Sequence, residues 1–266
     1  MSFTLPMLWA QWKESFSLFR WREFKPFILA SLLAFIRACK FIFTYVWWVF
    51  VVLFFLIAGL ACCGFHGAHQ NAPFDFIPTF FSSCFRAQGI RAFLATASLI
   101  ILIYVTLMAL HIITVLAIRP SLEIKNKNYL IKYFPKFPAF LVLLIPFNLL
   151  QLLFPSLLFF ADASNSFDAF MQSLWRGIKF MVHFLPISLF IVLAGNLLMF
   201  LLASTGGLLG IGITLLLPSL KAFAFTTTVF LFFFTSFIGF IFFAAMFSVY
   251  YTKIKHSHHQ VFFEQQ

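Results

Sequence analysis

Hydrophobic residues along this chain gather into long runs that are separated by short polar stretches. Six runs cover residues 41–65, 93–118, 137–161, 180–204, 206–220 and 222–251. A helix needs about 20 apolar residues to cross the hydrocarbon core of a bilayer. The run at 206–220 is shorter, so a re-entrant segment is the alternative there. We therefore expect an all-α fold, a polytopic transmembrane helical bundle of about six spans in one integral membrane domain, residues 1–266.

The N-terminal segment, residues 1–40, is more mixed in character. Its apolar stretch 27–36 is too short to cross a bilayer alone and is followed by Arg37 and Lys40. We expect residues 1–40 to lie along the membrane surface and to continue into the span at 41–65. Aromatic residues recur in this segment at the three-to-four spacing of an amphipathic helix: Trp9, Trp12, Phe16 and Phe19.

A short pattern, Ser-x-aromatic-Arg with an apolar residue four positions after the Arg, occurs at 17–20, 83–86 and 173–176. Each copy comes shortly before an apolar run. The pattern suits a short amphipathic helix at the membrane interface, with its aromatic side in the apolar layer and its guanidinium at the phosphates. Arg20, Arg86 and Arg176 are therefore candidate interfacial anchors. Chance recurrence in an aromatic-rich sequence is the alternative.

Lysines and arginines near the ends of the predicted spans indicate an orientation, because cytoplasmic loops carry an excess of them. Thirteen of the 18 basic residues fall in 1–40, in 119–136 and in the tail 252–266, and five fall on the opposite side. Both termini are therefore expected in the cytoplasm, which agrees with an even number of spans.

The three Ser-x-aromatic-Arg copies, together with the ending Phe247-Ser248-Val249-Tyr250-Tyr251-Thr252-Lys253, resemble a family of bacterial six-span membrane proteins of the YciC-like kind. That family is related to the membrane domain fused to some glycerophosphodiester phosphodiesterases. The resemblance extends over nearly the whole chain and implies a location in the bacterial inner membrane. It supplies no catalytic residue. It also implies a cytoplasmic position for Arg86 and Arg176, whereas the charge distribution places both on the other side.

Composition supports a lipid environment. Hydrophobic residues make up 63% of the 266 residues and charged residues only 9%, whereas a soluble domain is roughly half apolar and about a quarter charged. The formal net charge of +11 would suggest a nucleic-acid partner in a soluble protein. Here the basic residues flank apolar runs, so the expected partners are membrane lipids and other membrane proteins, and no nucleic acid.

All acidic residues fall outside the six apolar runs: Glu14, Glu23, Asp75, Glu123, Asp162, Asp168 and Glu264. A carboxylate inside the membrane is typical of proton and cation pathways, so an ion-driven pump is disfavoured.

The sequence also lacks the HExxH, phosphate-loop and GxSxG patterns of hydrolases. We expect a non-enzymatic membrane or envelope component without a cofactor. The alternatives are a permease-like subunit whose partner ATPase docks on 119–136, and an intramembrane lipid enzyme.

Four polar residues within the predicted spans are candidate functional positions: His111, Asn148, Gln151 and Asn196. They could line a path for a substrate, or they could form hydrogen bonds between helices, each worth below about 2 kcal/mol. We favour the second interpretation, in which the amides join the spans at 137–161 and 180–204. His183 is expected at the interface.

Two further patterns leave alternatives open. The sequence Cys62-Cys63-x-x-His66-x-x-His69 offers thiolate and imidazole ligands that suit zinc or copper. Its spacing matches no common zinc motif, so we expect no metal there. Gly206 and Gly210 form a GxxxG pair that allows two helices to approach closely. The alternative is that Gly206 and Gly207 simply form the turn between two spans.

Overall fold

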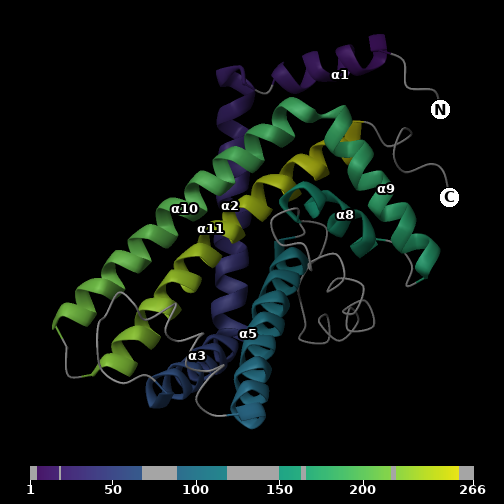
Figure 1. Ribbon diagram of the computed structural model, residues 1–266. Helices are drawn as coiled ribbons and strands as arrows, with labels where there is room; N and C mark the ends of the chain where they lie inside the picture. Colours follow the sequence, from purple (N-terminus) through teal and green to yellow (C-terminus); the bar gives the residue numbers. More distant parts are fainter. Residues whose placement is uncertain are drawn as a thin grey trace. The chain divides into compact units, whose positions relative to one another are not determined.

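The computed structural model describes residues 5–17, 19–67, 89–118, 150–162, 166–216 and 220–257. All regular structure in these ranges is α-helical (Figure 1). The helices are α1 (Leu5–Ser17), α2 (Trp21–Tyr45), α3 (Trp47–Gly67), α5 (Gly89–Ile118), α8 (Leu150–Asp162), α9 (Phe167–His183), α10 (Leu185–Leu216) and α11 (Lys221–Ser257). The predicted all-α fold is confirmed.

Within the described residues, four stretches of helix are long and apolar enough to cross a membrane: Trp21–Tyr45, Leu94–Val115, Leu185–Leu216 and Ala222–Ile254. Even the stretch with 22 residues is about 33 Å long, against a hydrocarbon core of about 30 Å. Trp47–Ala61 is a shorter apolar helix. The chain is therefore a helical membrane protein. The count of six spans stays a prediction, because most of the apolar run 137–161 lies outside the described residues.

The N-terminal helix bounds differ from those expected. Helix α2 begins at Trp21 and continues through Arg37 and Lys40 to Tyr45, so the stretch 27–36 is the middle of one long helix. The side chains of Arg37 and Lys40 are exposed. Long basic side chains lie along an apolar surface and direct their charge toward water, so the helix continues through them, as expected. The difference is that the expected span 41–65 is not one helix, because the chain turns at Val46, between α2 and α3.

A second difference concerns the expected boundary between the runs 180–204 and 206–220. Helix α10 passes through Gly206 and Gly207 without a break, so the turn alternative for these glycines is wrong. Residues 206–216 therefore continue the helix of the run 180–204 and do not begin a separate span or a re-entrant segment. The chain instead turns at Phe184, between α9 and α10 (Figure 1). Pro186 is the second residue of α10, a position where the missing proline N–H would have no partner within the helix.

The chain divides into two compact units, and α10 and α11 contribute residues to both. The first unit comprises Met1–Thr44, His111–Leu198 and Gly239–Gln266. In it, one stripe of α2 is buried: Phe27, Ser31, Ala38 and Ile42. Helix α2 contacts α11 through the Phe35 and Phe242 rings, 5.8 Å apart between centroids.

In the same unit, α9 approaches α8 very closely. A Cβ atom on Gly177 would lie 2.6 Å from the backbone nitrogen of Ser156. The Ser156 hydroxyl donates a hydrogen bond to the Leu174 carbonyl at 3.3 Å. Gly177 therefore permits the contact that fixes α9 against α8.

The second unit comprises Tyr45–Leu110 and Met199–Ile238. Phe50 of α3 contacts two rings of α11, Phe234 at 5.4 Å and Phe237 at 5.7 Å between centroids. A Cβ atom on Gly206 would lie 2.6 Å from the Leu231 carbonyl oxygen, and one on Gly210 would lie 2.6 Å from Thr228 Cβ. The prediction that the GxxxG pair allows close helix approach is confirmed.

Candidate functional site

The last turns of α11 form the centre of the first unit. Tyr250 is only 2% exposed. Its ring lies 6.5 Å from the Phe27 ring of α2, and 5.8 Å from both Phe180 of α9 and Phe184 at the turn before α10. Tyr251 contacts Phe159 of α8 with 5.0 Å between ring centroids. Four helices thus meet around two adjacent tyrosines.

Buried polar groups join helix α1 to this aromatic centre. The hydroxyls of Ser15 and Tyr250 are 3.4 Å apart, and the amide oxygen of Gln11 bonds to Nδ1 of His183. All four side chains are buried. We call these residues, Gln11, Ser15, His183 and Tyr250, the α1 cluster. Beside it, the Trp12 indole N–H donates to the Val182 carbonyl at 3.0 Å.

The surroundings of His183 favour its neutral form. The Gln11 amide oxygen faces Nδ1 of His183, and with the amide in this orientation Nδ1 is the donor, because an amide oxygen only accepts. Burial lowers the pKa of His183, and the positive charge of Lys179 lowers that pKa further. The imidazole is therefore neutral at neutral pH and acts as a donor that holds α1 in place.

Local sequence explains why these groups meet. Gln11 and Ser15 are four positions apart, so they share one face of α1. Helix α9 begins at an N-cap, where the Ser166 hydroxyl accepts from the Ala169 N–H at 3.1 Å. It ends at His183, and the Phe184 N–H donates to the Phe180 carbonyl at 3.0 Å. That end places His183 beside α1.

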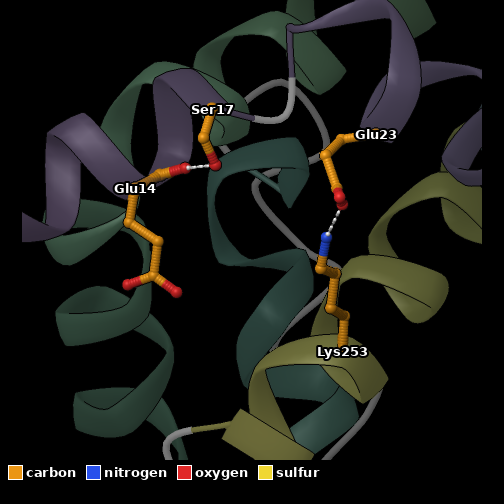
Figure 2. A network of polar contacts seen from close by, with 4 residues as sticks. All are labelled: Glu14, Ser17, Glu23 and Lys253. Carbon is orange, nitrogen blue, oxygen red and sulfur yellow. Dashed lines mark hydrogen bonds and ion pairs between the residues drawn. The ribbon is translucent and has the colours of Figure 1, made fainter.

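An exposed ion pair lies at the border of this region (Figure 2). Lys253 Nζ is 2.8 Å from Glu23 Oε2, and both side chains are about half exposed. The pair joins the first turn of α2 to the end of α11. The Ser17 hydroxyl donates to the Glu14 carbonyl at 2.6 Å. An exposed pair of this kind contributes at most about 1 kcal/mol, so the buried contacts carry most of the stability.

The predicted interfacial anchors occupy different local structures. Arg20 is exposed in the turn between α1 and α2, where its carbonyl accepts from the N–H groups of Glu23 and Phe24, both at 2.9 Å. Arg176 is half-buried inside α9. Arg86 lies outside the described residues. The two described copies of the pattern therefore differ in local structure, because one lies in a turn and the other within a helix. Each of them still precedes a long apolar helix, α2 or α10.

The structure describes two of the four predicted intramembrane polar positions. His111 is buried, and its ring lies 4.1 Å from the Phe240 ring between centroids. Asn196 is exposed, and its Nδ2 donates to the Val192 carbonyl at 2.8 Å, one turn earlier on α10. Asn148 and the Gln151 side chain lie outside the described residues. The predicted pairing of the amides therefore stays a prediction.

The side chains of the Cys62–His69 pattern also lie outside the described residues, so its metal binding stays open. Among the side chains that the structure does describe, no group of three His, Cys, Asp or Glu residues could hold a metal ion.

Sequence reasoning missed the α1 cluster. The available signal was the four-residue spacing of Gln11 and Ser15 on a helix rich in aromatic residues.

Comparisons with protein-family models, with curated proteins and with solved structures found no match to this chain.

Proposed function

We propose that the protein is a non-enzymatic component of the bacterial inner membrane that acts in membrane or envelope assembly through contacts with lipids and other membrane proteins. Both termini lie in the cytoplasm in this proposal, as the basic residues indicate.

One observation supports it most strongly: hydroxyl side chains of the long helices bond within their own helix. They donate to the carbonyl four residues earlier, at 2.7 to 2.9 Å: Ser31, Ser98, Thr106, Thr205, Thr226, Thr227, Thr228 and Thr252. Such bonds satisfy a hydroxyl in hydrocarbon without any partner helix or water. Hydroxyl groups that are bonded in this way are not offered to a substrate, which suits a structural membrane component.

The second candidate function is a permease-like subunit that works with a partner ATPase. Asn196 favours it, because this amide is exposed on the same helix as Leu193 and Leu197, both 61% exposed. A polar side chain in such a position suits a passage completed by another protein.

The replacement Asn196→Leu separates the two candidates. Cells that lack the gene would be complemented with this variant and with the control Thr205→Val, which alters an exposed hydroxyl of the same helix. A membrane component should function with either variant. Loss of complementation by Asn196→Leu alone, at normal protein level and stability, would support the permease.

A biochemical measurement gives an independent answer. The wild-type protein would be purified with its neighbours in a mild detergent and assayed for ATP hydrolysis. The proposal expects no ATPase to accompany the protein. A stoichiometric ATPase in the purified complex would contradict it.

A further inference from the structure

Helices α1 and α9 share a feature that the proposed function does not use. In each helix a Trp precedes the last residue by eight positions and a Lys precedes it by four. The Lys13 ammonium lies 5.7 Å from the centre of the Trp9 ring, and the Lys179 ammonium lies 5.5 Å from the centre of the Trp175 ring. The same cation-over-indole pair therefore occurs at the same place in two helices.

Helix α9 has three distinct faces. One face is buried against the protein and includes Ser173, Gly177 and Phe180. A second face is apolar and yet exposed: Phe167 75%, Met171 46%, Trp175 55%, Ile178 38% and Val182 39%. The third face is polar: Asp168, Gln172, Arg176 and Lys179. Residues three or four apart share a face of a helix, so each set forms a continuous stripe.

Helix α1 repeats this division. Gln11 and Ser15 form its buried face. Trp9 and Phe16 form an apolar face, in which they are 56% and 57% exposed. Lys13 is exposed at the border between this face and the polar residues Glu14 and Ser17. A soluble protein rarely exposes such a stripe of aromatic residues.

The two helices are also fixed to each other. The Trp12–Val182 and Gln11–His183 hydrogen bonds join α1 to the last turn of α9. Both helices then lead directly into long apolar helices, α2 and α10. They consequently stand where the chain enters the membrane, which is the level at which Trp side chains prefer to lie.

We propose that α1 and α9 together form a surface that binds anionic phospholipids, with their exposed apolar faces in the outer hydrocarbon layer and with Lys13 and Lys179 at the lipid phosphates. Charge complementarity selects this partner, because the exposed apolar residues are bordered by cations, and anionic headgroups attract such cations. The indole under each ammonium holds the charge at the border between hydrocarbon and headgroups. This inference depends only on the membrane location of the chain, and it holds for a passive component and for a permease subunit.

The test uses the full-length protein in phosphatidylcholine bilayers that contain spin-labelled phosphatidylglycerol or spin-labelled phosphatidylcholine. The relative association constant of the two lipids would be measured by electron paramagnetic resonance. We expect a preference for phosphatidylglycerol that falls by up to about fivefold for each of Lys13→Gln and Lys179→Gln. The control Lys40→Gln removes an exposed lysine of α2 that is outside this surface, and it should retain the preference.

A second measurement tests the orientation of α9. Single cysteines at Met171→Cys and Gln172→Cys, in a chain whose four native cysteines are replaced by serine, would carry a fluorophore that brominated lipid tails quench. Residue 171 belongs to the apolar face and should be quenched, whereas residue 172 belongs to the polar face and should not.

Three results would overturn the proposal. The first is an equal association of both lipids with the wild-type protein, and the second is an undiminished preference in the double Lys13→Gln, Lys179→Gln variant. The third is the absence of quenching at residue 171, which would mean that protein, and not lipid, covers the exposed face of α9.

Discussion

The close approach of α10 to α11 depends on the absence of a side chain at Gly210. A Cβ atom added there would lie 2.6 Å from both Cβ and Oγ1 of Thr228, and also too close to Thr228 Cα. Ordinary contacts between carbon atoms are about 3.5–4.0 Å, so Gly210→Ala must push the helices apart by about 1 Å. Overpacking of this kind costs about 1–3 kcal/mol. We expect the upper half of that range, because backbone cannot rotate away as a side chain can.

Gly212 provides a matched control in the same helix, since a Cβ atom added there meets no atom within 4 Å. Gly212→Ala should leave the free energy of unfolding unchanged or raise it by up to about 1 kcal/mol through helix propensity. The assay is unfolding of the purified protein in mixed micelles of increasing sodium dodecyl sulfate content. Adding Thr228→Ala to Gly210→Ala should restore only part of the loss, since this change removes Oγ1 but leaves the Cα and Cβ atoms at position 228. Equal stability of the two single glycine variants would refute the reasoning.

Three further predictions test other parts of the structure. Tyr250→Ala should lower the free energy of unfolding by about 3–5 kcal/mol. Tyr250→Phe removes only the 3.4 Å contact with Ser15, so it should lower the free energy of unfolding by less than about 1 kcal/mol. Similar losses in both variants would contradict the packing role of the Tyr250 ring. The folded protein has a lower His183 pKa than the ordinary value of 6.5, so the stability from this group is present above pH 6.5 and is lost as the pH falls below it. His183→Gln should flatten that part of the pH–stability curve, and an unchanged curve would exclude His183 as its source. For topology, cysteines placed in 119–136 and in 258–266 should react with an impermeant reagent only after the membrane is permeabilised, and labelling of the tail from outside would require an odd number of spans.

Much of the fold could be predicted from the sequence because lipid restricts the possibilities. A chain with so few charges has to satisfy its backbone hydrogen bonds internally, and helices do this without any partner. The GxxxG pair was equally informative. Gly206 and Gly210 are one turn apart, and two glycines on one face of an apolar helix allow another helix to approach its backbone closely.

The helix bounds could not be predicted as well. The continuation of α2 through Arg37 and Lys40 was expected, but the turn at Val46 divides the expected span 41–65, and no proline, glycine or charged residue marks that position in the sequence. Gly206 and Gly207 weaken a helix in water by about 1 kcal/mol each. Contact with α11 compensates for this weakness at Gly206, so α10 continues past both glycines.

The α1 cluster was missed for a different physical reason. An unpaired amide is most costly in the middle of a span, so the polar positions predicted from the sequence all lie there. In the structure, hydroxyls on the long helices mostly bond to their own backbone, whereas Gln11, Ser15 and His183 join separate helices. Gln11 and Ser15 lie on α1, outside every predicted apolar run, and His183 and Tyr250 lie close to the ends of theirs. A buried hydrogen bond between elements far apart in sequence becomes visible only when the chain has been folded. In this protein such bonds hold the two amphipathic helices whose outer faces we assign to lipid.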